Sequence, residues 1–198
     1  ARAYKEKGDA AFKSGKMLEA CNEYEACGGL FKWATTLRED WRTRSLEDED
    51  IREEEFLGET DDQRRAIASL RVKCYCNLAR AYAKQKEHKT AVHACDWALA
   101  VDPASSNALY LRAAFLTEPA SSGTTERDAA IADLEKANQI VEAGSRTAKD
   151  VDTLLRELKR LRRVGRENDR AYGGMFDRGA VYGEDESSRR RAADTRAK

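Results

Sequence analysis

Apolar and small residues recur along this chain with the spacing of paired amphipathic helices. The landmarks of a first copy are Tyr4, Gly8, Phe12, Gly15, Ala20, Tyr24 and Cys27. The matching landmarks of a second copy are Tyr75, Ala79, Tyr82, Ala91, Cys95, Ala98 and Pro103. A third copy runs through Leu109, Ala113, Ala130, Leu134 and Ala137. Recurrence of this kind predicts a stack of helix pairs, in which each pair covers the apolar face of the next.

Side-chain size explains the landmarks. Small residues such as Gly8 and Ala20 let the two helices of a pair approach closely, whereas large residues such as Tyr24 and Leu134 fill the space between pairs. This is the tetratricopeptide (TPR) pattern, a helix–turn–helix of about 34 residues. The predicted fold is therefore all-α, an α-solenoid of three such repeats followed by a long C-terminal capping helix.

The repeats are predicted at about 1–34, 72–105 and 106–144, and with the insertion between the first two they span residues 1–144. An acidic insertion at 38–71 separates the first two. Its flanking sequences, FKWATTLREDW and DDQRRAIASLR, favour extensions of the neighbouring helices around an acidic loop. The polar sequence TEPASSGTTE is typical of a flexible loop inside the third repeat. We expect no β-sheet in the first hundred residues.

A last helix is predicted over 148–170, because apolar residues recur there at spacings of three and four. They are Val151, Leu154, Leu155, Leu158, Leu161 and Val164. Such a helix can cap the apolar face that the final repeat would otherwise expose. Residues 171–198 turn glycine-rich and then charged, which predicts a flexible tail.

Composition excludes several classes of function. Lys plus Arg total 36 and Asp plus Glu also total 36, so no overall field favours nucleic acid or an acidic membrane. The five cysteines fall within helical patterns at spacings that do not suit a metal, and we interpret them as small buried residues in a reducing cytoplasm. Neither histidine has an evident catalytic partner. We therefore expect no enzyme activity, metal or cofactor, and a location in the cytoplasm, with the nucleus as a second compartment.

The segments YKEKGDAAFKSGK, RVKCYCNLARAYAKQKEHKTAVHACDWALAVDP, ALYLRAA and AIADLEKA resemble the repeat domain of large tacrolimus-binding (FKBP-type) immunophilins. The segment YGGMFDRGAVY is similar to the end of that domain in apicomplexan-type members. Cyclophilin-type immunophilins share much of the pattern and are a close alternative. The resemblance implies a co-chaperone whose full-length parent is a peptidyl-prolyl isomerase, of which this chain, beginning at Ala1, is a non-catalytic fragment.

The resemblance also implies a partner, the acidic C-terminal tail of the ninety-kilodalton heat-shock chaperone, which ends in Met-Glu-Glu-Val-Asp. In the family, five polar residues clamp the carboxylates of that tail in a concave groove. Lys5 and Asn77 match the clamp pattern. Asp9 stands in place of Asn, Asn107 in place of Lys, and Leu111 in place of Arg. The clamp is therefore degraded, which predicts weakened or redirected binding.

Lys5 and Asp9 are four residues apart on one predicted helix, so they can pair and occupy the surviving clamp lysine. We hypothesise that Lys73, Arg80 and Lys84 compensate by moving the anion-binding centre toward the second repeat. Further basic residues near this register are Arg2, Lys13 and Arg112.

Two other functions stay open. The capping helix is basic opposite its leucine stripe, a pattern typical of calmodulin targets, so calmodulin is a candidate partner. Alternatively, the convex face or the terminal helix mediates self-association or binds another partner, and the groove is vestigial. A groove binder is expected to be a monomer without its ligand.

Overall fold

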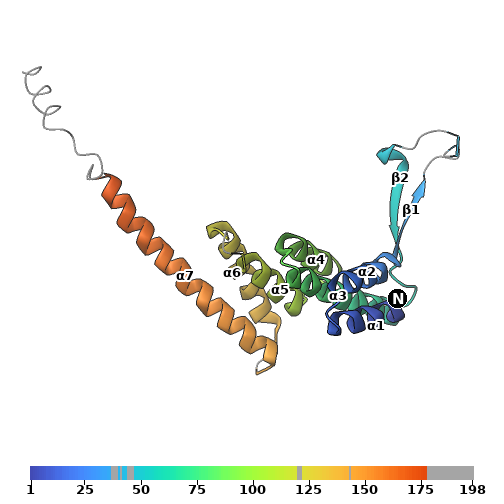
Figure 1. The fold of residues 1–198 in the computed structure, drawn as a ribbon, viewed down its shortest axis with the longest axis horizontal. Coiled ribbons are helices and arrows are strands. Elements are labelled where there is room, and N and C mark those ends of the chain that lie inside the picture. Colours follow the sequence, from blue (N-terminus) through green and yellow to red (C-terminus); the bar gives the residue numbers. More distant parts are fainter. Residues whose placement is uncertain (37–39, 41, 44–46, 120–121, 143, 178–198) are drawn as a thin grey trace, which may run out of the picture. The chain divides into compact units, whose positions relative to one another are not determined.

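The computed structural model describes residues 1–36, 40, 42–43, 47–119, 122–142 and 144–177. Three helix–turn–helix pairs follow one another in these ranges, and a longer helix comes after them (Figure 1). The pairs are α1 (Arg2–Lys13) with α2 (Met17–Gly29), α3 (Asp61–Lys84) with α4 (His88–Val101), and α5 (Ser106–Thr117) with α6 (Thr124–Ile140). The last helix is α7 (Arg146–Asp177). Within the described ranges, no helix is both long and apolar enough to span a membrane.

Contacts divide the chain into two units, residues 1–155 and 156–198. In the first unit, Val151 and Leu155 of α7 are buried; in the second, Leu158 is buried and Leu161 and Val164 are exposed. Helix α7 continues to Asp177, beyond the predicted limit of 170. The capping role stays a prediction. The rest of the predicted tail, 178–198, lies outside the described residues.

Helix α3 is the centre of the stack, because it contacts α1, α2, α4 and α5. Its contacts with α1 and α5 bring the first helices of the three pairs into one layer. The second helices alternate with them along the chain (Figure 1). We call the surface formed by α1, α3 and α5 the inner face.

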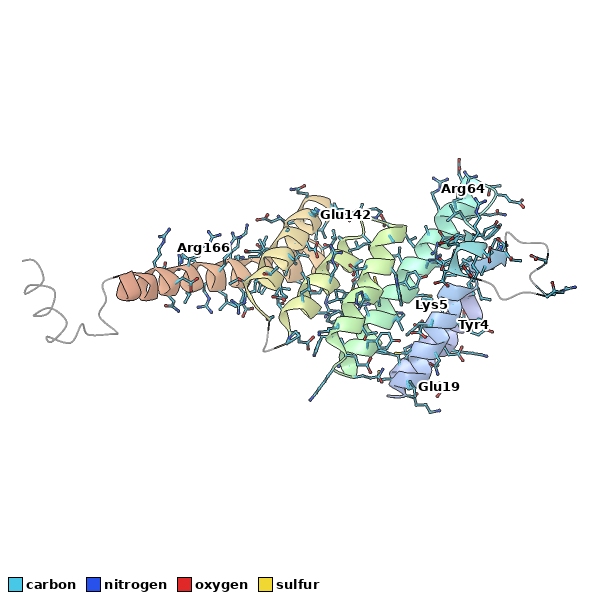
Figure 2. The ribbon with its side chains drawn as sticks, turned by 90° about the horizontal axis from the view of Figure 1, so that it is seen from above. Tyr4, Lys5, Glu19, Arg64, Glu142 and Arg166 are labelled. Carbon is cyan, nitrogen blue, oxygen red and sulfur yellow. The ribbon has the colours of Figure 1, made fainter. Side chains whose placement is uncertain are left out.

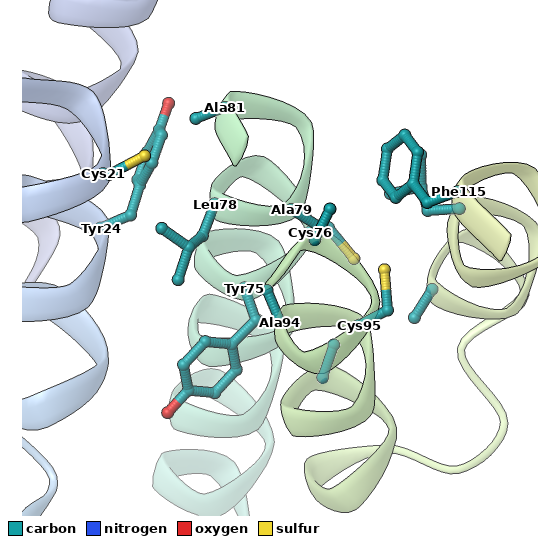
Figure 3. Close-up of a cluster of buried hydrophobic side chains, with 14 of the residues drawn as sticks. Cys21, Tyr24, Tyr75, Cys76, Leu78, Ala79, Ala81, Ala94, Cys95 and Phe115 are labelled. Carbon is teal, nitrogen blue, oxygen red and sulfur yellow. The ribbon is translucent and has the colours of Figure 1, made fainter. Parts of the chain in front are cut away.

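Small residues set the spacing between the helices, as the sequence pattern predicts. Ala20, Ala79 and Ala91 are completely buried, and larger residues fill the gaps beside them. Figure 3 shows Tyr24 of α2 and Leu78 of α3 in the same core. All five cysteines are buried and free, which confirms their interpretation as small core residues. The Sγ atoms of Cys27 and Cys74 lie 3.0 Å apart between α2 and α3.

The turns inside the first two pairs have the same geometry. Gly15 between α1 and α2 has a φ of 81°, and Lys86 between α3 and α4 has a φ of 65°. Glycine adopts this left-handed conformation without steric cost, whereas lysine does so only under the constraint of its neighbours. The shared backbone geometry supports the equivalence of the two turns that the landmark spacing predicts.

The insertion contradicts one prediction. Residues Lys32–Thr36 form a strand, β1, that pairs antiparallel with β2 (Ile51–Glu55), where we predict a helical extension and no sheet. Helix α2 ends at Gly29, and glycine disfavours its continuation. The following KWATT sequence is rich in residues that favour strands. The hairpin projects beyond α2 and α3 (Figure 1), outside the repeats, so the α-solenoid itself is unaffected.

The other predicted extension is correct. Helix α3 begins at Asp61, well before the second repeat. Thr60 caps it by accepting a hydrogen bond from the backbone N–H of Gln63 at 3.3 Å, and the side chain of Gln63 accepts one from the N–H of Thr60 in return. This reciprocal capping box fixes the point at which the hairpin returns to the helical stack.

Gly8 tests the close helix approach directly. A Cβ atom at Gly8 would lie 2.7 Å from the ring of the buried Tyr24. We expect Gly8→Ala to lower the free energy of unfolding by about 1–3 kcal/mol, because the core must expand to accept it. The matched control is Gly29→Ala, where the new Cβ meets no atom within 4 Å. Urea unfolding measures both variants, and equal transition midpoints would contradict the proposed packing.

Candidate functional site

Five polar side chains form a continuous hydrogen-bonded line across the inner face. Lys5 Nζ donates to Asp9 Oδ2 at 2.5 Å, and Asn77 Nδ2 donates to Asp9 Oδ1 at 3.1 Å. Arg80 then donates from Nη1 to Asn77 Oδ1 at 3.2 Å and from Nη2 to Asn107 Oδ1 at 2.9 Å. The line links α1, α3 and α5 and therefore all three pairs. Lys5, labelled on α1 in Figure 2, stands at its start.

Asp9 is the most heavily bonded group of this line. Besides Lys5 and Asn77, the hydroxyl of Tyr24 donates to Asp9 Oδ1 at 2.8 Å. Burial alone would raise the pKa of Asp9, but the hydrogen bonds from Lys5, Tyr24 and Asn77 outweigh it and lower the pKa. Three donors favour the ionised carboxylate. Asp9 is therefore an anion at neutral pH.

Lys5 forms an ion pair with Asp9, as the spacing of four residues predicts. The hydrogen bond to Asp9 raises the pKa of Lys5 despite partial desolvation. The pair is about one quarter to one third exposed, with side-chain fractions of 24% and 31%. Lys5 therefore remains protonated, but its field is largely compensated before any ligand arrives.

Arg80 occupies the middle of the line and differs from Lys5 in its partners. Both of its acceptors are neutral amide oxygens, so its hydrogen bonds orient the guanidinium without neutralising it. In the part of the chain that the structure describes, no salt bridge to Arg80 is present. The fork geometry of a guanidinium suits a carboxylate ligand. Arg80 is thus an oriented cation whose charge is not compensated by a contacting carboxylate.

Lys73 and Lys84 extend this positive charge along α3. Residues 73, 77, 80 and 84 follow helical spacings of three and four, which place them on one side of the helix. Both lysines are exposed. The side chains hypothesised to move the anion-binding centre therefore do share a stripe on the second repeat.

Helix α5 contributes less than the clamp pattern requires. Leu111 is buried in the core at 5% exposure, so this position presents no donor to the inner face. The neighbouring Arg112 is fully engaged elsewhere, with Asp133 at 2.6 and 2.7 Å and with Asp96 at 2.7 Å. The guanidinium of Arg112, one of the basic residues near the predicted register, therefore ties α5 to α4 and α6 and adds no uncompensated charge to the inner face.

Sequence reasoning missed the roles of Tyr24 and Asn107. Tyr24 reaches Asp9 from a different helix, and nothing in the spacing of the two residues predicts that contact. Asn107 replaces the lysine that the clamp pattern requires at this position. Its amide oxygen nevertheless accepts a hydrogen bond that holds Arg80 in place. The expected polar residue at position 107 is a lysine, which could not accept this bond.

The Asp9 network predicts a pH dependence of stability. A pKa that is lowered in the folded state contributes stability above the unfolded pKa, near 3.8, and that contribution is lost as the pH falls through the folded value. We expect Asp9→Asn to unfold at lower urea than wild type at pH 7, and the difference to shrink toward pH 3. Because the pair is partly exposed, the effect should be about 1 kcal/mol or less.

The control is Glu19→Gln, which removes the exposed ion pair between Glu19 and Lys16. Its stability should track wild type at both pH values. A gap between wild type and Asp9→Asn that persists unchanged at pH 3 would show that ionisation of Asp9 does not stabilise the fold.

Comparisons with known proteins agree with this architecture. The tetratricopeptide repeat model matches residues 72–105. The C-terminal TPR-containing domain of a putative FK506-binding protein from Plasmodium falciparum aligns at a TM-score of 0.52 with 19% identity, covering 81% of this chain and 89% of that one. The first TPR domain of Spaghetti, solved with the HSP90 peptide SRMEEVD, aligns at a TM-score of 0.51 with 20% identity, covering 80% and 90%. At these identities the likeness shows the fold.

Proposed function

We propose that this TPR domain, a protein-interaction module and not an enzyme, binds an acidic C-terminal peptide on its inner face, with Arg80 as the principal cationic donor. The candidate ligand is the tail of the ninety-kilodalton heat-shock chaperone. The observation that carries the proposal is the pair of neutral amides around Arg80, because they hold the guanidinium in one orientation and leave its charge available. The peptide seen with the Spaghetti domain supports the choice of ligand.

The energetics favour weak binding. A hydrogen bond to a charged group contributes about 1.5–3 kcal/mol, while micromolar affinity requires roughly 8 kcal/mol in total. Lys5 must share its ammonium between Asp9 and the ligand, and Leu111 offers no donor. Arg80 with its neighbours Lys73 and Lys84 therefore has to supply most of the attraction. We expect a dissociation constant well above about 1 µM.

The wider assignment belongs to the same proposal. The parent protein would be a peptidyl-prolyl isomerase co-chaperone of the FKBP type, acting in the cytoplasm, with this domain bringing it to the chaperone. The likeness to the Plasmodium domain supports the FKBP type. Calmodulin binding by α7 stays a prediction; of its apolar stripe, Leu161 and Val164 are exposed and Leu158 is buried.

Titration with the peptide SRMEEVD tests the proposal. Arg80→Ala should weaken binding at least tenfold, which corresponds to about 1.4 kcal/mol, because the uncompensated cation is lost. Lys89→Ala, which removes an exposed lysine on α4, should bind as wild type does. Asp9→Asn should bind more tightly than wild type, since Lys5 is released. Isothermal titration calorimetry measures all four proteins, with circular dichroism as the check on folding.

Two results would overturn the proposal. One is the absence of heat from wild type at millimolar peptide, and the other is equal affinity of wild type and Arg80→Ala. Sedimentation at several concentrations adds a further criterion. Self-association that the peptide does not affect, together with absent binding, would favour the alternative of a vestigial inner face.

A further inference from the structure

The hairpin creates a concave surface that is separate from the inner face. A cavity of about 880 Å³ lies between the hairpin and helices α2, α3 and α4. Helix α3 contributes Arg64, Ala68, Arg71 and Tyr75, which follow spacings of four, three and four and so form one stripe. Tyr75 and Asn77 are two residues apart, and at about 100° per residue they point to nearly opposite sides of α3. The cavity and the inner face therefore use opposite sides of one helix.

Exposed aromatic side chains form part of the cavity wall. Trp33 of β1 is 45% exposed and Trp97 of α4 is 47% exposed. Trp97 packs on Tyr75 with ring centroids 5.9 Å apart. Leu57, just after β2, adds a further exposed apolar side chain. Tryptophan is enriched at the energetic centres of protein interfaces, and apolar side chains clustered around a cavity suit a bulky apolar side chain of a partner.

The floor of the cavity holds a polar group that lacks an acceptor. The Arg71 side chain is only 4% exposed; Nη2 pairs with Glu55 and the guanidinium lies over Tyr75. Its Nε has no hydrogen-bond partner among the described residues. A backbone carbonyl of an occupant could accept this bond after a small shift of the side chain. Arg71 and Glu55 neutralise each other, so the floor itself selects no charge.

The charge around the cavity selects the occupant. Residues 47–62 contain ten acidic side chains and one basic one, Arg52. Ion pairs with Arg64, Arg65 and Arg71 offset three of them. Glu53 and Glu25 lie in the cavity wall itself, but Lys32 and Arg64 line it too, so the excess of negative charge lies on the hairpin around the cavity. The remaining excess of negative charge attracts Lys and Arg and repels the acidic peptide proposed for the inner face.

The hairpin also offers backbone hydrogen bonds. In the described part of the insertion, β1 and β2 pair only with each other, so each strand has an outer edge whose N–H and C=O groups are not paired within the ladder. An extended peptide can add to such an edge, with alternate side chains directed into adjoining pockets.

We propose that this surface docks an extended basic segment of a partner protein, with one bulky apolar side chain inserted between Trp33 and Trp97. Lys and Arg residues on both sides of that anchor meet the acidic hairpin. The anchor supplies affinity through burial, and the flanking charges supply selectivity and salt dependence. The proposal does not depend on peptide binding at the inner face.

Three capped synthetic peptides test it against the 198-residue chain. The probe is acetyl-Lys-Arg-Leu-Phe-Arg-Lys-amide. One control replaces every basic residue by Glu or Asp, and the other replaces Leu-Phe by Ser-Ser. We expect the probe to bind at least tenfold more tightly than either control, by calorimetry and by a change in tryptophan emission. If the Ser-Ser peptide bound as tightly as the probe, the binding would come from unspecific charge attraction alone, and the proposal would be overturned.

Variants locate the binding. Trp97→Ala and Glu53→Lys should each weaken the probe at least tenfold, whereas Leu18→Ala, an exposed apolar residue of α2 outside the cavity lining, should not. Unchanged binding in both cavity variants would overturn the proposal. Arg80→Ala should leave probe binding intact, and Trp97→Ala should leave SRMEEVD binding intact. The proposals for the two surfaces are therefore tested independently of each other. Concentration-dependent self-association that the probe displaces would make a second copy the occupant and overturn the partner proposed.

Discussion

Close contact between helices through small side chains is the constraint on which the whole array depends. Ala20, Ala79, Ala91 and Ala98 are completely buried, and Gly8 leaves no room for even one methyl group beside Tyr24. Interiors packed at this density transmit small displacements instead of absorbing them. The register of α1 against α2 and α3 therefore fixes where Lys5, Asp9 and Asn77 lie. The geometry of the proposed binding surface thus depends on small apolar residues that take no part in its hydrogen bonds.

Asp9 links the stability of the stack to the proposed peptide binding. Its carboxylate receives donors from α1, α2 and α3, which locks the first pair onto the second. The same carboxylate compensates the lysine that an acidic ligand would need. If the inner face binds the proposed acidic peptide, stability and affinity compete for one ammonium group, whereas the guanidinium of Arg80, held by uncharged amides, is outside that competition. This difference, more than the number of basic residues, sets the balance of charge on the inner face.

The sequence predicted what depends on local periodicity. The helix pairs follow from the recurring landmarks, the early start of α3 from the helical character of DDQRRAIASLR, and the Lys5–Asp9 contact from a spacing of four residues. It did not predict the hairpin: KWATT favours a strand, but a strand needs a partner, and the glutamates of its partner Ile51–Glu55 disfavour strands by themselves. Nor could it predict that Arg112 is bound to Asp133 and Asp96, since three helices must first assemble. Contacts between distant segments were the missing information.

The position of the hairpin has a broader consequence for how such arrays diversify. It enters at the connection between α2 and α3, where the chain passes from one pair to the next, and the two helices still pack directly on each other. Closing a longer loop costs only about 0.6 kcal/mol per doubling of its length. Inter-repeat junctions of a solenoid can therefore acquire whole accessory elements at little thermodynamic expense, and a new recognition surface can evolve there while the original one is left untouched.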